Sequence, residues 1–330
     1  MQIAVDAMGG DFAPHEIVAG ALQAAASLSG IERIILVGDE SAVKKECNGQ
    51  VPPSIEIVHA SESIGMEESP ANAIRRKKDS SISRAIDLVK SGRAQAMISA
   101  GNTGAVVVAA TLKLRTLKGV GRPAIATLMP TPTKPFILID AGGNTDCPAS
   151  LLLQFAAMGH VYAREILTQP DPVIGLMNVG TEDSKGNEIT KEAFRLLSAS
   201  NLNFKGNIEG HDLFKGGIDV AVCDGFVGNV ILKTSESVAH AVSTWVRREF
   251  TSSPLRMLGA LCLKGALNGI KRAMDPEMYG GAPLLGVNGI CIICHGASSA
   301  RAIFNAIRVA RDSVRHQIND MIIKTVEGLP

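Results

Sequence analysis

Residues 96–104 read Ala96-Met97-Ile98-Ser99-Ala100-Gly101-Asn102-Thr103-Gly104, an apolar run that ends in a loop of small residues. A helical pattern follows over residues 104–117. Four other places show the same order of apolar run, small-residue loop and helical pattern, beginning at Ile3, Phe136, Val173 and Val220. Continuously apolar runs predict strands that are buried on both faces, as in a parallel sheet between helices. The sequence therefore predicts an α/β fold with a mostly parallel sheet flanked by helices.

The rest of the chain fits this pattern. Further apolar runs predict strands at Arg33–Val37, Ile55–His59, Ala124–Leu128 and Ile290–Ile293. Helical patterns are present at His15–Ser27, Ser81–Lys90, Leu151–Leu167, Lys191–Ala199, Asn229–Phe250 and Ser298–Gln317. Because no internal repeat or long linker is evident, we expect residues 1–330 to form a single α/β domain, with a projecting helical segment at about residues 235–278.

Charge and segment lengths exclude several classes of protein. The 330 residues carry 33 Lys and Arg against 32 Asp and Glu, a formal net charge of +1. A protein that binds nucleic acid through its overall charge would show a basic excess, so no nucleic-acid partner is expected. The first residues lack the pattern of a signal peptide, and the longest apolar stretch is too short to span a bilayer. We expect a cytoplasmic protein, with peripheral membrane contact left open.

Glycine, at 33 residues, gathers in the loops that follow the apolar runs. In an open parallel sheet these loops line one crevice, where ligands bind. Glycine allows the backbone to approach a ligand, and helix N-termini supply unpaired N–H groups. Such loops are common connectors, but five at one edge favour an oxyanion site, most simply for phosphate. The candidate residues are Gly9, Gly10, Gly101, Asn102, Thr103, Gly104, Gly142, Gly143, Asn144 and Gly228.

Two short motifs lie in the wrong context for their usual function. Residues 119–124 match a dinucleotide-binding fingerprint, yet they follow a helical pattern and lead into a strand. Residues 291–295 read Cys-x-x-Cys-His, the spacing of a haem-attachment site, but they lie within an apolar strand, and two cysteines with one histidine are too few for a zinc site unless a distant residue supplies another ligand. We therefore expect no cofactor and no metal. Cys147 and Cys223 are either buried core thiols or nucleophiles.

Two segments suggest contacts with partners. The run Arg75, Arg76, Lys77 and Lys78 is either a solvated helix face or a patch that holds phosphate or an acidic protein. Residues 253–274, if helical, form either a packed helix in a core or dimer interface, or a basic amphipathic helix on a membrane. Its apolar side would comprise Leu255, Leu258, Cys262, Leu263, Ala266 and Ile270, and its polar side Lys264, Asn268, Lys271 and Arg272.

A series of short motifs along the whole chain resembles one known family. The motifs are DAMGGD (6–11), HASE (59–62), IGM (64–66), RKKDSS (76–81), SAGNTGA (99–105), QFAAMG (154–159), GNIEG (206–210), CDGFVGNV (223–230) and YGGAPLLG (279–286). On these residues the chain resembles the PlsX family of bacterial phosphate acyltransferases, which form acyl phosphate from acyl-acyl-carrier-protein and inorganic phosphate. It departs from the family at the loop 140–144 and at His211, where arginine is usual.

The resemblance implies a Rossmann-like fold, similar to the phosphotransacetylases and isocitrate dehydrogenase-like enzymes, and a homodimer with its cleft near the interface. It also implies transfer of acyl phosphate to a membrane glycerol-3-phosphate acyltransferase, for phospholipid synthesis. Contact with an anionic membrane surface would fall to Leu255, Leu258, Leu263 and Ile270. Acyl carrier protein would dock on the cationic run 75–78.

Attack of phosphate on a thioester needs positioning and charge relief more than a strong base, because phosphate is already an oxyanion. Lys185 is the only cation in the loop 178–186 and is suited to hold phosphate or the developing oxyanion. Asn229, at the opening of a helix, is either an N-cap or an amide donor to the thioester oxygen. By resemblance, Lys185 and Asn229 are the expected catalytic residues. Nearby carboxylates would repel phosphate, and we interpret them as caps or orienting partners: Asp6, Asp11, Asp140 and Asp224.

Other functions stay open at this point. A phosphotransacetylase would use a coenzyme A thioester with the same nucleophile. A hydroxy-acid dehydrogenase of the same broad fold would use NAD. A membrane-associated scaffold would bind the carrier protein through residues 75–78 without chemistry. Within the same reaction, the acyl group could also pass through Cys147 or Cys223.

Overall fold

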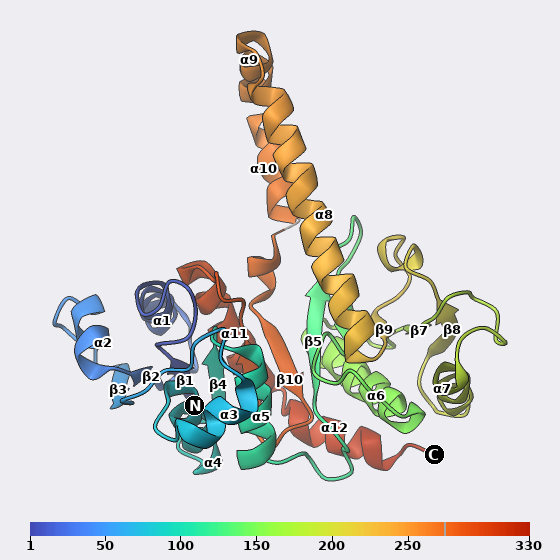
Figure 1. The fold of residues 1–330 in the computed structure, drawn as a ribbon, viewed down its shortest axis with the longest axis horizontal. Coiled ribbons are helices and arrows are strands. Elements are labelled where there is room, and N and C mark those ends of the chain that lie inside the picture. The colour runs from blue at the N-terminus through green and yellow to red at the C-terminus, as the bar shows by residue number, and fades with distance from the viewer. Residues whose placement is uncertain (274) are drawn as a thin grey trace.

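The computed structural model describes residues 1–273 and 275–330. An 11-stranded sheet runs across the molecule in the order β3-β2-β1-β4-β11-β10-β5-β6-β9-β7-β8, with helices on both faces (Figure 1). The strands are β1 (Gln2–Asp6), β2 (Arg33–Gly38), β3 (Ile55–His59), β4 (Ala96–Ser99), β5 (Ala124–Met129), β6 (Phe136–Ile139), β7 (Ile174–Met177), β8 (Phe204–Ile208), β9 (Val220–Val222), β10 (Ala282–Leu285) and β11 (Ile290–Ile293).

The helices follow the strands in regular alternation through most of the chain. The α-helices are α1 (His15–Ser27), α2 (Glu40–Glu46), α3 (Pro70–Arg76), α4 (Ser81–Lys90), α5 (Thr103–Lys113), α6 (Ala149–Ile166), α7 (Glu188–Ser198), α8 (Gly225–Thr251), α9 (Pro254–Cys262), α10 (Lys264–Ala273), α11 (Ala300–Arg315) and α12 (Ile318–Glu327). Two short 3-10 helices are η1 (Asp212–Phe214) and η2 (Pro276–Tyr279).

The predicted mostly parallel sheet is confirmed, but it consists of two parallel sets that run in opposite directions. Strands β3, β2, β1, β4 and β11 are mutually parallel, as are β6, β9, β7 and β8. Between the sets, β10 is antiparallel to both β11 and β5, and β5 is antiparallel to β6. Three successive reversals leave the sets antiparallel. The carboxyl ends of their strands therefore lie at opposite edges of the sheet.

Burial on both faces explains why the strands are continuously apolar. In β1, Ile3 and Val5 pack into the core under α1 and α11, while Ala4 packs into the core under α4 and α5. In β6, Ile137 and Ile139 contribute to the core with α6 and α12. Successive side chains on each strand therefore pack into different cores. Because both faces are buried, apolar and polar residues cannot alternate along these strands.

Two strands were missed by the sequence analysis, each for a local reason. Residues 204–208 form β8, the edge strand of the second set, and their mixture of lysine, glycine and asparagine hides the strand signal. Residues 282–285 form β10 in the middle of the sheet, although Pro283 lies within it. Proline removes a ladder donor and usually argues against a central strand, so a sequence pattern alone rejects this one.

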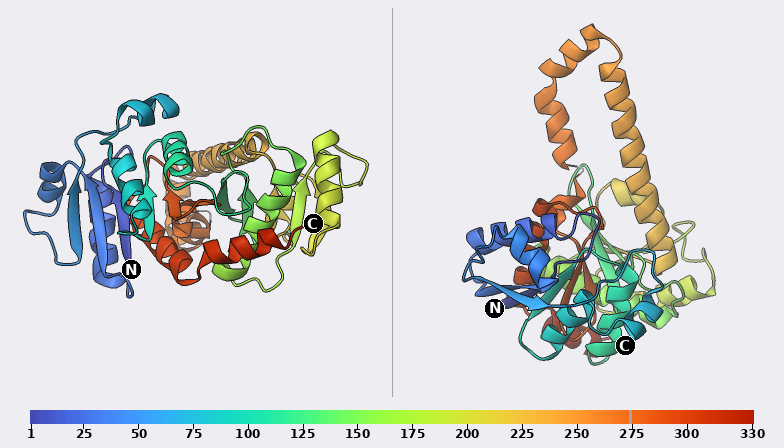
Figure 2. Two further views of the ribbon diagram at one scale, coloured as in Figure 1. Left: turned by 90° about the horizontal axis from the view of Figure 1, so that it is seen from below. Right: turned by 60° about the vertical axis from the view of Figure 1, so that its left-hand side comes forward.

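Helices α8, α9 and α10 project away from the sheet, and both figures show the projection (Figures 1 and 2). Helix α8 begins at Gly225, and among its residues only Gly225 and Gly228 are buried. Residues 253–274 do not form one helix, because α9 ends at Cys262 and α10 begins at Lys264. The chain returns through η2, where the Glu277 carboxylate accepts hydrogen bonds from the backbone N–H (3.3 Å) and hydroxyl (2.7 Å) of Ser299.

The close contact between α8 and β6 gives a test of the fold. A Cβ atom added to Gly228 would lie 1.9 Å from the backbone oxygen of Asp140, so Gly228→Ala must push α8 away from the sheet. We expect it to lower the free energy of unfolding by about 2 kcal/mol or more. The matched control is Gly259→Ala in α9, where nothing lies within 4 Å and alanine should stabilise the helix slightly. Equal thermal unfolding temperatures for the two variants would contradict this packing.

Candidate active site

A buried carboxylate shapes the loop that follows β6. Asp140 is fully buried and accepts hydrogen bonds from five N–H groups. The donors are the backbone N–H groups of Ile125 (2.9 Å), Gly142 (3.2 Å), Gly143 (2.9 Å) and Asn144 (2.6 Å), and the Asn144 side-chain amide (2.8 Å). Burial raises the pKa of Asp140, and the N–H donors oppose that rise. The interpretation of Asp140 as an orienting partner for backbone donors is confirmed.

The N-terminus of α8 packs tightly on this loop. Asp224 is the N-cap of α8, because its carboxylate accepts a hydrogen bond from the backbone N–H of Val227 at 2.8 Å. The alternative of Asn229 as the N-cap is therefore wrong. Asn229 lies about one turn further along α8 and faces the loop after β6. A Cβ atom added to Gly142 in that loop would lie 3.6 Å from the Cβ of Asn229. Its side chain is exposed and makes no hydrogen bond to any described residue.

Lys185 lies in the loop after β7. The loop turns back on itself, since the backbone N–H of Lys185 donates to the carbonyl oxygen of Glu182 at 3.0 Å. The side chain of Lys185 is exposed, and its ammonium forms no ion pair within the described part of the chain. Because β6, β9 and β7 are adjacent and parallel, the loops after all three strands open at the same edge. This edge holds Gly142, Gly143, Asn144, Lys185, Gly228 and Asn229.

The loops after β1 and β4 form a separate group. Gly9 and Gly101 touch closely, since a Cβ on Gly9 would lie 2.6 Å from the backbone N of Gly101. The buried Asp6 carboxylate, whose pKa burial raises, accepts a hydrogen bond from the Ser99 hydroxyl at 2.6 Å. Gly10 has a φ of +111°, which a residue with a side chain rarely adopts. Close packing and backbone conformation therefore explain why glycine occupies these positions, without a bound ligand.

Asn102 is occupied by its structural role. Its oxygen accepts from the backbone N–H of Ala105 (3.0 Å) as the N-cap of α5, and its amide donates to the carbonyl oxygens of Gly65, Met66 and Glu68. Thr103 and Gly104 follow in the first turn of α5. An anion at this edge would meet chiefly backbone N–H groups.

The expectation that all five loops share one edge is wrong. The three reversals at β10, β5 and β6 turn the second set around, so the loops after β1 and β4 leave one edge of the sheet and the loops after β6, β7 and β9 leave the other. No hydrogen bond between described residues joins the two groups. The expected catalytic residues Lys185 and Asn229 both belong to the second group.

The cysteines near the site are poor nucleophiles. Burial raises the pKa of Cys147 to about 11 and raises that of Cys223 well above its usual value. Cys291 and Cys294 are buried in and beside β11, where burial raises the pKa of each to about 12. The structure supports the interpretation of Cys147 and Cys223 as core thiols, and it shows Cys291 and Cys294 to be core thiols as well.

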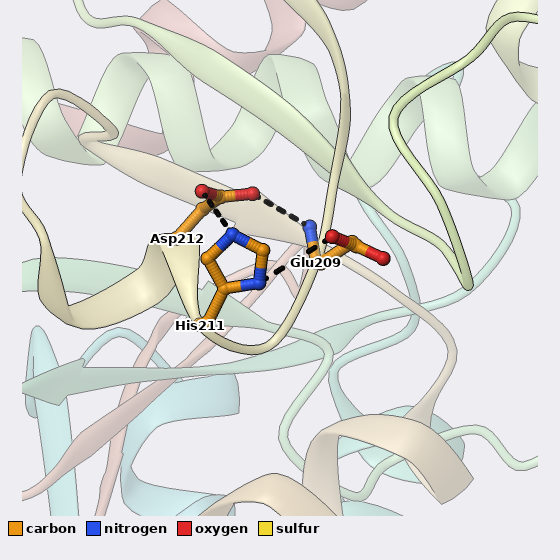
Figure 3. A group of neighbouring side chains, drawn as sticks. All are labelled: Glu209, His211 and Asp212. Carbon is orange, nitrogen blue, oxygen red and sulfur yellow. Dashed lines mark hydrogen bonds and ion pairs between the residues drawn. The ribbon is translucent and has the colours of Figure 1, made fainter.

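Besides the motif at residues 291–295, the described residues contain a second group of side chains that could bind a metal ion. Glu209, His211 and Asp212 lie together in the loop after β8 (Figure 3). The Asp212 carboxylate already accepts from the backbone N–H of Glu209 (3.0 Å) and from the ammonium of Lys215 (3.2 Å). The His211 ring lies between the two carboxylates, 3.4 Å from Glu209 and 3.1 Å from Asp212. Hydrogen bonds and ion pairs already engage these three side chains, of which His211 is exposed and the two carboxylates are half-buried.

The cationic run divides into structural and available side chains. The Lys77 ammonium donates to the carbonyl oxygen of Ser63 (2.8 Å) and to the carboxylate of Glu68 (2.6 Å), so it anchors the preceding loop. Arg75, Arg76 and Lys78 are exposed and form no ion pair with any described residue.

Three of the four predicted membrane-contact residues lie in the projecting helices, and Leu263 lies between α9 and α10. Leu255, Leu258, Leu263 and Ile270 are 81%, 59%, 51% and 58% exposed. Met257 and Leu261 on α9, which the sequence analysis did not single out, are exposed as well. The side chains of Lys271 and Arg272, and Met274, lie outside the described residues. None of the described helices is long and apolar enough to cross a bilayer.

Comparisons with known proteins agree with this architecture. A family model described as "Fatty acid synthesis protein" matches residues 1–321. A phosphate acyltransferase of Pelotomaculum thermopropionicum is 50% identical over 330 residues, which cover 100% of this chain and 96% of that protein. A phosphate acyltransferase of Geobacter sulfurreducens is 47% identical, over 99% of this chain and 94% of that protein.

Solved structures share the fold at low sequence identity. A phosphotransacetylase of Streptococcus pyogenes matches with a TM-score of 0.65 and 19% identity, over 96% of this chain and 94% of that one. A branched-chain phosphotransacylase of Enterococcus faecalis matches with a TM-score of 0.57 and 15% identity, over 95% and 99%.

These findings define the class of the protein as an enzyme of the acyltransferase type. The chain belongs to the fatty acid synthesis protein family, the PlsX family that its motifs indicated.

The buried thiols give a test of acyl transfer through cysteine. With a pKa of about 11, only about one Cys147 side chain in a thousand is a thiolate at pH 8. Iodoacetamide should therefore label the exposed Cys262 before the buried Cys147, and labelling of Cys147 should rise as the pH rises toward 11. Cys147→Ala and Cys223→Ala should each keep their turnover. Loss of turnover that follows Cys147 labelling would support the covalent route instead.

Proposed function

We propose that this enzyme transfers a long-chain fatty acyl group from acyl-acyl-carrier-protein to inorganic phosphate, giving acyl phosphate for phosphatidic acid and phospholipid synthesis. One observation carries the proposal. The amide of Asn229 and the ammonium of Lys185 lie at the same edge of the sheet, exposed and without partners among the described residues. An unpaired amide and an unpaired cation beside rigid backbone suit two oxyanions, the phosphate and the tetrahedral intermediate.

The reaction follows from these groups. A phosphate oxygen attacks the thioester carbonyl carbon, a C–O bond forms, and the carbonyl electron pair moves to its oxygen. The Asn229 amide donates a hydrogen bond to that oxyanion, and the Lys185 ammonium offsets the charge that phosphate brings to it. Collapse of the intermediate breaks the C–S bond and releases the carrier thiolate, which takes a proton from water. The chain need supply no covalent nucleophile.

An apolar path for the acyl chain begins at Asn229. An open depression of about 490 Å³ lies along α8 and is lined by Asn229, Val230, Lys233, Thr234, Ser237, Val238 and Ala241. These residues extend over about 18 Å of helix, at 1.5 Å per residue. We place the long aliphatic chain of the donor against this face, with its thioester at Asn229.

The protein partners are part of the same proposal. Arg75, Arg76 and Lys78 offer three unpaired cations for an acidic carrier protein, whereas Lys77 is already engaged. We also propose a homodimer, supported by the exposed apolar residues Val242 and Trp245 on α8.

A peripheral position on an anionic membrane completes the proposal. Exposed Leu255, Leu258, Leu263 and Ile270 lie in the segment of α9 and α10, which projects away from the sheet (Figure 2), where they can enter a bilayer surface without disturbing the core. From the cytoplasmic face the enzyme would pass acyl phosphate to the membrane glycerol-3-phosphate acyltransferase.

The catalytic assignment is tested by phosphate-dependent release of free thiol from a long-chain acyl carrier protein. Lys185→Ala and Asn229→Ala should each lower turnover by about 10²–10³, because each removes a donor to developing negative charge. Formation of acyl phosphate should equal the thiol released. Thiol release without phosphate, or full turnover in both variants, would contradict the proposal.

The donor is tested in the same assay. A coenzyme A thioester with the same acyl chain should react much more slowly than the carrier-protein thioester. Equal rates with both donors would move the assignment to a phosphotransacetylase. Carrier binding by the folded protein with no thiol release at any phosphate concentration would favour the scaffold.

Membrane contact is tested with Leu258→Asp and Leu263→Asp combined. Burying two carboxylates in a bilayer surface is unfavourable, so affinity for anionic vesicles should fall by at least about tenfold while turnover in solution is kept. The matched control is Leu112→Asp on α5, an exposed leucine far along the chain from the projecting helices. Unchanged vesicle binding by the double variant would refute this contact.

A further inference from the structure

We infer that Asn207 is a positioning residue that, together with Asn178, holds the Lys185 loop in its working conformation. This inference rests on the proposed catalytic role of Lys185. Neither asparagine needs to contact substrate in this account. They lie at or just beyond the carboxyl ends of β7 and β8, the two neighbouring strands beside the loop.

The two side-chain amides tie the two ends of the turn that contains Lys185. The amide of Asn178 donates to the carbonyl oxygen of Lys185 at 3.1 Å. The amide of Asn207 donates to the carbonyl oxygen of Glu182 at 2.9 Å. A backbone bond from the N–H of Lys185 to the carbonyl oxygen of Glu182 (3.0 Å) closes the same turn. Each end of the turn is therefore fixed to a different strand of the sheet.

Few other hydrogen bonds restrain this turn. Residues 181–185 are all exposed, and the backbone N–H groups of residues 180–184 donate to no acceptor among the described residues. A loop with few buried contacts samples many conformations unless specific bonds select one. Gly186, with a φ of +95°, completes the turn, and a Cβ there would lie 2.6 Å from the Asn178 side-chain oxygen. The amide ties therefore hold the backbone from which the Lys185 side chain extends, and the side chain itself packs on Gly180, where a Cβ would lie 2.9 Å from the Lys185 Cγ.

Asn207 is a costly residue at its position if stability alone is considered. The residue is 6% exposed, and its side-chain oxygen is buried without a hydrogen-bond partner among the described residues. A buried acceptor without a donor destabilises the folded state. An apolar residue would avoid that cost but would leave the carbonyl of Glu182 untied. The amide donor therefore serves the loop more than it serves the core.

A double-mutant cycle separates positioning from a general structural effect. In the otherwise unchanged enzyme, Asn207→Ala should lower kcat by about tenfold, because Lys185 no longer stays in place. In the Lys185→Ala enzyme, the same change should have no further effect. The thermal unfolding temperature of Asn207→Ala should stay within a few degrees of the parent or rise. Asn207→Asp, which keeps the shape and loses the donor, should reproduce the loss of kcat if the alanine variant fails to fold.

The matched control lies just before the other end of β8. Asn203 also donates its amide to a backbone carbonyl, that of Asp171 at 3.3 Å, and Asn203→Ala should leave kcat unchanged. Full kcat in Asn207→Ala, or an equal loss in the Lys185→Ala background, would overturn the positioning role. Full turnover in Lys185→Ala would instead reject the proposed catalytic assignment, so the two failures are distinguishable.

Discussion

The buried carboxylate of Asp140 is the constraint on which the second edge of the sheet depends, that is, the edge formed by the loops after β6, β7 and β9. Its five N–H donors come from the loop after β6 and from Ile125 on β5, so it joins the antiparallel centre of the sheet to the site. The loop then has one shape, and α8 can pack on it only because Gly228 carries no side chain. Asn229 owes its place beside Gly142 to that packing.

The reversal of strand direction decides which loops can act together. The first edge is formed by the loops after β1 and β4. There the Ser99 hydroxyl donates a hydrogen bond to Asp6, and the side chain of Asn102 forms hydrogen bonds with the local backbone. At the second edge, Lys185 and Asn229 remain without partners among the described residues. A ligand-binding edge needs polar groups that are free to bind the ligand, and a glycine-rich loop does not by itself supply them. The difference between the two edges is chemical, although their sequences look alike.

Much of the fold could be predicted from the chain because apolar runs report burial on both faces. Strand direction could not, since a buried strand has the same composition whichever way it runs, and Pro283 hid the strand that makes two of the three reversals. Lys185 and Asn229 were expected through resemblance, whereas the tie from Asn207 to Glu182 spans 25 residues and has no local pattern. The residue at which α8 begins also could not be predicted, because either Asp224 or Asn229 could be its N-cap.

The location of bound phosphate tests the central claim most directly. A crystal structure of the enzyme with phosphate should place the anion at the edge formed by β6, β7 and β9, within hydrogen-bond reach of the Lys185 ammonium and beside Asn229 and Gly142. Phosphate held instead by the loops of Gly10, Gly101 and Thr103, with the second edge empty, would contradict the account. That result would assign the chemistry to the other half of the sheet.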